Sequence, residues 1–292
     1  MAKPVNPAAL LVLLSGAVCI AFAPIFVRLS EIGPIATAFY RLALSLPLFW
    51  AWLGWQRHSV TPPRGPACAA DYRLLFLAGF FFACDLSFWH WSIRLTSVAN
   101  ATLLANFAPI FVTLGSWLIF RERFSVKFLT GMCCAITGVI ILLGASVSIS
   151  PQHVIGDLLG VTTAVFYGAY ILTIGRLRRR FSTVTIMAWS GAGGSVALLI
   201  VTLISGESLL PPTLTGWLVL IGLALVSQTA GQSLIAWALA HLSAAFGSVT
   251  LLLQPVIAAL IAWLLFAESL GLLQSVGGCV VLAGVFLARR GV

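Results

Sequence analysis

The sequence contains ten apolar runs, each long enough to cross a lipid bilayer as a helix. A spanning helix needs about 20 mostly apolar residues, because the hydrocarbon core is about 30 Å thick. Ten such runs take up about two thirds of a chain of this length and leave only short loops. We therefore predict an all-α integral membrane protein, with transmembrane helices at residues 8–29, 35–55, 72–92, 97–120, 127–145, 155–175, 183–205, 214–238, 243–266 and 272–288.

The composition agrees with this class and excludes others. Hydrophobic residues make up 61% of the chain and charged residues 8%, whereas soluble domains carry about 25% charged residues. The six cysteines have no metal-binding spacing, so we expect small buried side chains, no metal site and no cofactor. An intramembrane protease would need paired aspartates or a metal motif, and only one aspartate lies deep in a predicted span. We therefore expect a protein that is not an enzyme.

The basic residues predict the orientation in the membrane. Arg28, Arg41 and Arg94 fall on one side, and the other 13 Lys and Arg residues fall on the opposite side. Because short cytoplasmic loops are rich in Lys and Arg, we expect both termini to be cytoplasmic and the protein to lie in the inner membrane. The run RLRRR at 176–180 could suggest nucleic-acid binding, but a topology determinant explains it better, so we expect the lipid bilayer and no nucleic acid as a partner.

An internal repeat divides the chain into two halves. Residues 97–143 and 243–289 align at an offset of 146, without gaps, and 12 of the 47 positions are identical. The offset is half the chain length, which predicts one five-helix repeat at 1–146 and a second at 147–292. Five spans are an odd number, so the repeats must have opposite orientations. Inverted repeats are typical of secondary transporters, whose substrate binds near the midplane at the repeat interface; a duplicated structural membrane protein is the alternative.

Several aligned residues suit structural or gating roles. Proline inside a helix frees a backbone carbonyl and permits a kink. Small residues at helical spacing let two backbones approach closely. Glutamates that end a span can be solvated or paired there. The residues assigned to these roles are Pro109, Pro255, Glu122, Glu268, Gly131, Gly138, Gly277 and Gly284.

These aligned residues resemble the pattern of the ten-helix EamA-type family of the drug/metabolite transporter superfamily. The family places a Pro inside helices 4 and 9, a Glu at their ends, and Gly along helices 5 and 10. The resemblance implies an inner-membrane carrier that in bacteria mostly exports amino acids or related metabolites. We expect the YddG-type aromatic amino acid exporters to be the member group in question, although these motifs mark the scaffold and do not identify the substrate.

Two charged residues stand out inside the predicted spans, where an ionisable group suggests function. Arg41 and Asp85 lie about 9 and 10 Å from the same membrane face at 1.5 Å per residue. Together they could clamp the carboxylate and ammonium groups of a zwitterion. Alternatively, they form a structural ion pair, or Arg41 extends toward the interface. Asp85 and His90 are candidates for proton coupling, although a hydrogen-bonded interfacial role also suits His90.

Uncharged polar and aromatic residues complete the predicted substrate site. Gln228 and Gln232 lie one turn apart, and Gln254 precedes a proline. Such groups either bond neighbouring helices or contact a ligand, and aromatic faces stack on aromatic cargo or hold a cation. The candidate substrate-binding residues are Arg41, Asp85, Trp89, Tyr167, Tyr170, Gln228, Gln232 and Gln254.

We therefore expect an alternating-access exporter of amino acids or related small metabolites, with a central cavity lined by helices 1–4 and 6–9. An exporter of cationic drugs is the alternative, since the aromatic cavity would serve it equally well. The sequence leaves the oligomeric state open, and a monomer is compatible with it.

Overall fold

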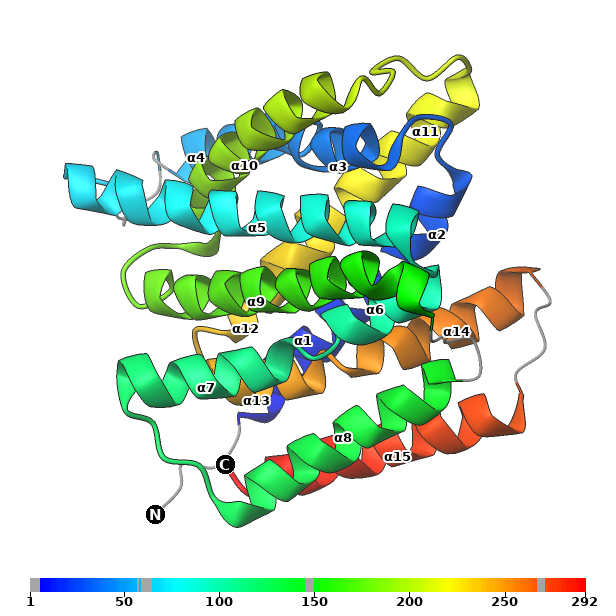
Figure 1. The fold of residues 1–292 in the computed structure, drawn as a ribbon. Helices are drawn as coiled ribbons and strands as arrows, with labels where there is room; N and C mark the ends of the chain where they lie inside the picture. Colours follow the sequence, from blue (N-terminus) through cyan, green and yellow to red (C-terminus); the bar gives the residue numbers. More distant parts are fainter. Residues whose placement is uncertain (1–5, 57, 59–64, 145–149, 267–270) are drawn as a thin grey trace.

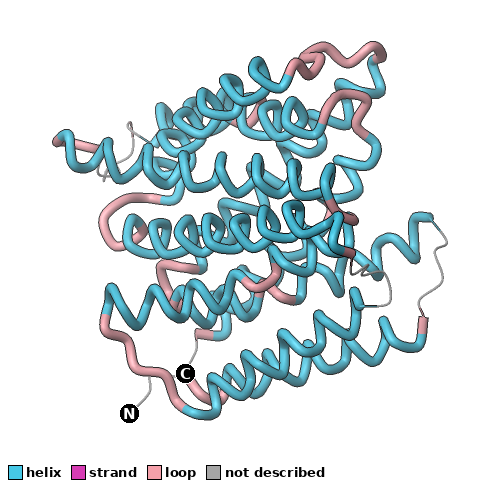
Figure 2. The backbone as a smooth tube through the Cα atoms, viewed as in Figure 1, coloured by secondary structure: helices cyan, strands magenta, loops and turns pink. Residues whose placement is uncertain are grey.

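A computed structural model describes residues 6–56, 58, 65–144, 150–266 and 271–292, and this part of the chain is helical and contains no strand (Figures 1 and 2). Ten helical segments are long and apolar enough to cross a membrane, which confirms the predicted fold class. The helices are α1 (Pro7–Ala21), α2 (Ala23–Leu29), α3 (Pro34–Ala43), α4 (Leu46–Gln56), α5 (Ala69–Leu95), α6 (Val98–Ala105), α7 (Ala108–Phe120), α8 (Val126–Gly144), η1 (Pro151–His153), α9 (Val154–Leu177), α10 (Thr183–Ser205), α11 (Leu214–Gly222), η2 (Leu223–Gln232), α12 (Ser233–Ala238), α13 (Ala244–Thr250), α14 (Leu253–Phe266) and α15 (Leu272–Arg289).

Four of the ten spans are each built from two successive α-helices, and each break precedes a proline. The pairs are α1 with α2, α3 with α4, α6 with α7 and α13 with α14. Pro24, Pro47, Pro109 and Pro255 lie in the first turn of the second helix of their pair. Proline has no N–H to donate and is tolerated in a first turn, where no intrahelical acceptor is available. The prolines therefore fix where these spans break.

The eighth span contains a π-helix instead of a proline break. Segment η2 runs over Leu223–Gln232 between α11 and α12. The Thr229 hydroxyl donates to the Ala224 carbonyl five residues earlier, at 2.8 Å. π-helical turns occur often at functional sites, and this one carries Gln228 and Gln232.

The two halves of the chain run in opposite directions. Helix α1 begins at the end of the molecule where the C-terminus lies, whereas α9, the first long helix of the second half, begins at the opposite end (Figure 1). At the first end Arg180 pairs with Asp71 at 2.9 Å, and the Ser125 hydroxyl donates to the Gly291 carbonyl at 2.6 Å. We call it the Arg-rich end, since its described basic residues are Arg73, Arg121, Arg123, Lys127, Arg176, Arg178, Arg179, Arg180, Arg289 and Arg290. The opposite end is the Arg-poor end.

Helices α8 and α15 pack against each other in antiparallel orientation through their small residues. An ideal Cβ on Gly131 would lie 2.3 Å from the Ala288 nitrogen, and one on Gly138 would lie 2.5 Å from the Val281 nitrogen. Backbones that approach this closely leave room only for glycine. The predicted structural glycines Gly131, Gly138, Gly277 and Gly284 all lie at this contact.

Candidate functional site

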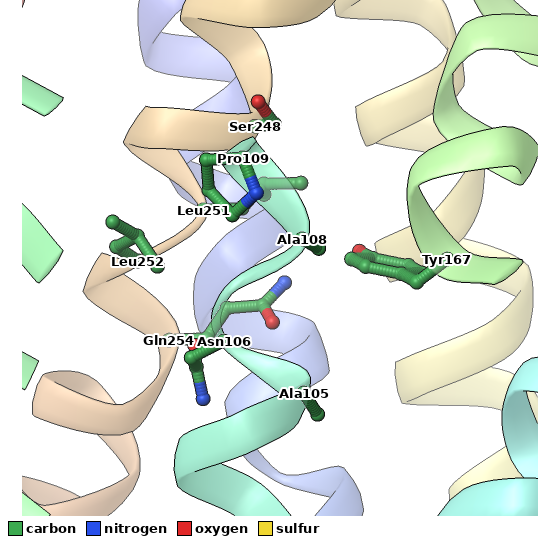
Figure 3. Close-up of a pocket in the computed structure, with 9 residues that line it drawn as sticks. All are labelled: Ala105, Asn106, Ala108, Pro109, Tyr167, Ser248, Leu251, Leu252 and Gln254. Atoms are coloured by element: carbon green, nitrogen blue, oxygen red, sulfur yellow. The ribbon is translucent and has the colours of Figure 1, made fainter. Parts of the chain in front are cut away.

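A small cavity lies where the broken fourth span, α6 and α7, meets the broken ninth span, α13 and α14 (Figure 3). Its volume is about 20 Å³, room for about one water molecule. It is lined by Ala105, Asn106, Ala108, Pro109, Tyr167, Ser248, Leu251, Leu252 and Gln254.

The lining residues relate the cavity to the internal repeat. Ala105 with Leu251, Asn106 with Leu252 and Ala108 with Gln254 are pairs separated by 146 positions, the repeat offset. Equivalent residues of both halves therefore face one cavity, which places it at the interface between the repeats. Discontinuous helices at such an interface form the substrate sites of many secondary transporters.

Two amide side chains give this cavity polar character. Asn106 donates through Nδ2 to the Thr102 carbonyl at 2.8 Å, in the turn that ends α6. The Gln254 amide interacts with the hydroxyl of Tyr167, which lines the same cavity, but its buried Nε2 has no partner at normal hydrogen-bond geometry among the described residues. A buried donor at poor hydrogen-bond geometry is unfavourable, so this amide suits a polar ligand group that enters the cavity.

From the cavity, a chain of aromatic contacts leads to the buried arginine. Tyr167 lines the cavity, and its ring stacks on that of Tyr170 at 6.3 Å between centroids. Tyr170 stacks on Phe82 at 4.7 Å, and the Arg41 guanidinium carbon lies 5.3 Å from the Phe82 ring centre. These contacts connect α9, α5 and α3, so they join the two halves of the chain.

Two glutamines of the π-helix η2 are the polar partners of Arg41 and Tyr170 in this series of contacts. Arg41, which is 8% exposed, donates through Nε to Oε1 of Gln228 at 3.0 Å. One turn along, the Tyr170 hydroxyl lies 3.5 Å from Oε1 of Gln232. Among the described residues the bond to Gln228 is the one hydrogen bond of the Arg41 side chain, and a bond to a neutral amide leaves most of its five guanidinium donors available.

Asp85 lies on the same face of α5 as Phe82, three residues further along the helix. It is 8% exposed. Within the described chain its carboxylate accepts no hydrogen bond and lies more than 4 Å from every basic side chain, although it interacts electrostatically with Arg41, Tyr167 and Tyr170. The direct ion pair that the sequence left open is therefore not formed.

The remaining predicted site residues lie elsewhere. Trp89 contacts the ring of His90 at 4.9 Å; both lie at least one turn beyond Asp85 toward the Arg-poor end. His90 is 2% exposed, and its Nδ1 has no partner among the described residues. Glu122 follows α7 at the Arg-rich end, where its backbone N–H donates to the Ser116 carbonyl at 3.2 Å. Glu268 lies outside the described residues.

Sequence reasoning missed Phe82 and two loop glutamates. Phe82 belongs to a run of three phenylalanines at 80–82, and only its neighbours in space distinguish it. Glu207, whose side chain is 5% exposed, pairs with Arg94 and accepts the Ala36 N–H at 2.9 Å. Glu31 accepts the Thr213 N–H at 3.2 Å and the Thr213 hydroxyl at 2.6 Å.

These glutamates form hydrogen bonds between the two halves at the Arg-poor end. Glu207 belongs to the second half and caps the first turn of α3 in the first half. Glu31 belongs to the first half and binds Thr213, the residue that precedes α11 in the second half. The first N–H groups of a helix lack intrahelical acceptors and attract anions, so each carboxylate stabilises a helix of the opposite half.

At the Arg-rich end, arginines of the α9–α10 connection bind groups on other helices. Arg178 donates through Nε to the Ala236 carbonyl at 3.1 Å and through Nη1 to the Phe181 carbonyl at 2.5 Å; burial lowers the pKa of its guanidinium. Arg180 pairs with Asp71 of α5. The central cavity therefore lies between ion-paired contacts at both ends of the molecule.

Comparisons with known proteins agree with this architecture. The sequence matches the EamA-like transporter family over residues 7–144 and 154–290. An "Uncharacterized transporter" of Archaeoglobus fulgidus is 25% identical over 90% of this chain and 91% of its own. "Pseudopaline exporter CntI" of Pseudomonas aeruginosa is 28% identical, over 74% and 75%. "Probable terminal-alkyne amino-acid exporter" of Streptantibioticus cattleyicolor is 26% identical, over 69% and 67%.

A solved crystal structure shares the fold. It superposes with a TM-score of 0.81, at 17% sequence identity, and the match covers 96% of both chains. The family match covers nearly the whole chain, in two segments that each contain five candidate spans. The chain is a multi-pass membrane transporter and belongs to the EamA-like transporter family.

Proposed function

We propose that this transporter exports amino acids or closely related zwitterionic metabolites by alternating access. The observation that carries the proposal is a pair of buried opposite charges, Arg41 and Asp85, that do not bond each other and lie beside the interface of the two halves. Burying charged groups without a mutual ion pair is costly. A ligand that carries both charges would satisfy both groups at once.

The surrounding groups support the same class of substrate. A carboxylate would bind Arg41 in place of the Gln228 amide, because charge-assisted hydrogen bonds are stronger than those to neutral acceptors. An ammonium group would bind Asp85. Tyr167, Tyr170 and Phe82 would pack against an apolar or aromatic side chain. Two relatives whose names include "exporter" handle an amino acid or pseudopaline by those names.

The distribution of basic residues supports one orientation in the membrane. We propose that the Arg-rich end faces the cytoplasm, since basic residues mark cytoplasmic loops, and that the membrane is the inner membrane. Both termini would then be cytoplasmic. In this orientation Glu31 and Glu207 form the outer gate, and the Arg180–Asp71 pair belongs to the inner gate.

The mechanism requires the gates to open in turn. The central cavity in this conformation holds about one water molecule, so the helices must separate before an amino acid can enter. The breaks before Pro109 and Pro255 supply points at which spans can bend. We propose Asp85 as the proton-coupling group, because it is the carboxylate that lies among the candidate substrate residues.

A transport screen tests the proposal. The full chain is reconstituted into liposomes, and the exit of a panel of radiolabelled amino acids is followed at two external pH values. Saturable movement of at least one amino acid above protein-free liposomes is expected. Transport of organic cations without any amino acid would favour the drug-exporter alternative, in which Asp85 and the aromatic rings would hold the cation. No movement of any amino acid would contradict the proposal.

A further inference from the structure

A second pocket opens at the Arg-rich end, apart from the central cavity. Ile119 and Phe120, the last residues of α7, line one side. Arg176, Arg179 and Arg180, at the end of α9 and in the turn that follows, line the other. Its volume is about 420 Å³. Because α7 belongs to the first half and α9 to the second, this pocket lies between the two halves.

The cationic side of this pocket is only partly neutralised by the described chain. Arg180 pairs with Asp71 at 2.9 Å. Arg176 and Arg179 are exposed, and neither guanidinium group makes a hydrogen bond or ion pair with another described residue. Three guanidinium groups therefore line this pocket, and one carboxylate, that of Asp71, pairs with one of them. A planar guanidinium matches the geometry of a phosphate, which it can bind through two parallel hydrogen bonds.

The other side of the pocket has the opposite character. Ile119 is 63% exposed, and the preceding Trp117 and Leu118 are also exposed. In a spanning helix these side chains face lipid hydrocarbon, since the bilayer is the solvent there. The pocket thus places an apolar wall, continuous with the lipid-facing surface of α7, beside unpaired arginines.

We propose that this pocket binds an anionic glycerophospholipid, with its phosphodiester at Arg176 and Arg179 and an acyl chain along Ile119 and Phe120. Basic pockets between transmembrane helices bind anionic headgroups. A zwitterionic lipid brings a cation that the arginines would repel, and a soluble phosphate has no group for the apolar wall. Topology alone would require basic residues at this end but not a pocket between α7 and α9. A lipid here would bridge the two halves.

The test is a lipid titration followed by native mass spectrometry of the full-length protein in detergent. The probe is dioleoylphosphatidylglycerol, and dioleoylphosphatidylcholine is the neutral comparison. The double variant Arg176→Gln/Arg179→Gln removes the two unpaired charges. The double variant Arg289→Gln/Arg290→Gln removes two charges at the same end of the molecule, outside the pocket, and serves as the matched control.

We expect the pocket variant to bind the anionic lipid about 30-fold more weakly, since each basic residue near an anionic headgroup contributes about fivefold. The control variant should bind it within about threefold of wild type, and binding of the zwitterionic lipid should not depend on the variant. Equal loss in both double variants would overturn the proposal. If the double variant does not fold, Arg176→Gln and Arg179→Gln should each show about a fivefold loss.

A competition arm separates lipid from free phosphate. Inorganic phosphate and glycerol phosphate are added at millimolar concentration to the protein loaded with the anionic lipid. Retention of the lipid is expected, because the soluble anions lack the acyl chain. Displacement of the lipid by either anion would overturn the proposal and assign the pocket to a soluble phosphate compound.

Discussion

Replacing Glu207 by Gln should weaken the closure of the Arg-poor end. The amide can still accept the Ala36 N–H, which lies 2.9 Å from the carboxylate in the structure, so the change removes charge and keeps shape. The ion pair with Arg94 contributes less than about 1 kcal/mol, because the Arg94 side chain is 47% exposed. A carboxylate at a helix N-terminus contributes about 0.3–1 kcal/mol. Together these terms predict a loss of about 0.5–2 kcal/mol, or about a 2- to 30-fold rise in the open population.

Hydrogen exchange measured by mass spectrometry can detect this opening. The informative segment is 213–216, because Thr213 donates its described hydrogen bonds to Glu31. If the two glutamates close one gate, Glu207→Gln should also speed exchange at 213–216, by the same factor of about 2 to 30. Glu122→Gln is the control, since it makes the same chemical change at the opposite end of the molecule. Faster exchange around Ala36 with unchanged exchange at 213–216 would refute the reasoning and reduce Glu207 to a local helix cap.

Two further predictions concern packing and coupling. Gly131→Ala should cost about 1–3 kcal/mol, because its Cβ would meet the Ala288 backbone at 2.3 Å, whereas Gly144→Ala in the same helix meets nothing within 4 Å. Thermal unfolding should therefore begin several degrees lower in the first variant only, and equal melting curves would contradict the close approach of α8 and α15. Asp85→Asn should abolish acceleration of transport by an imposed pH gradient in liposomes, and an undiminished response would remove Asp85 from proton coupling.

The spans were predictable because the bilayer imposes their length and apolar character. Prolines also limited where spans could break, and the 146-residue offset identified Pro109 and Pro255 as equivalent positions. The π-helix in the eighth span has no such marker. Its residues, LALVSQTAGQ, are compatible with an α-helix, and the wider turn depends on how the neighbouring helices pack around it.

The candidate site could be predicted only in part. Buried charges are rare enough in a membrane protein that Arg41 and Asp85 stood out in the sequence. Their partners could not be identified from the sequence. Arg41 and Gln228 are 187 positions apart, and nothing in the local sequence distinguishes Phe82 from Phe80 and Phe81. The loop glutamates Glu31 and Glu207 resemble ordinary solvated residues until the fold brings each to a helix of the other half.

The central claim is that Arg41 recognises the carboxylate of a zwitterionic substrate, and paired substrates test it most directly. Transport of the best amino acid from the screen and of its decarboxylated amine is measured in liposomes for wild type and Arg41→Gln. Loss of a charge-assisted hydrogen bond costs about 1.5–3 kcal/mol, so the variant should lose about 10- to 150-fold in apparent affinity for the amino acid and little for the amine. An equal loss for both compounds would contradict the claim and make Arg41 a structural residue.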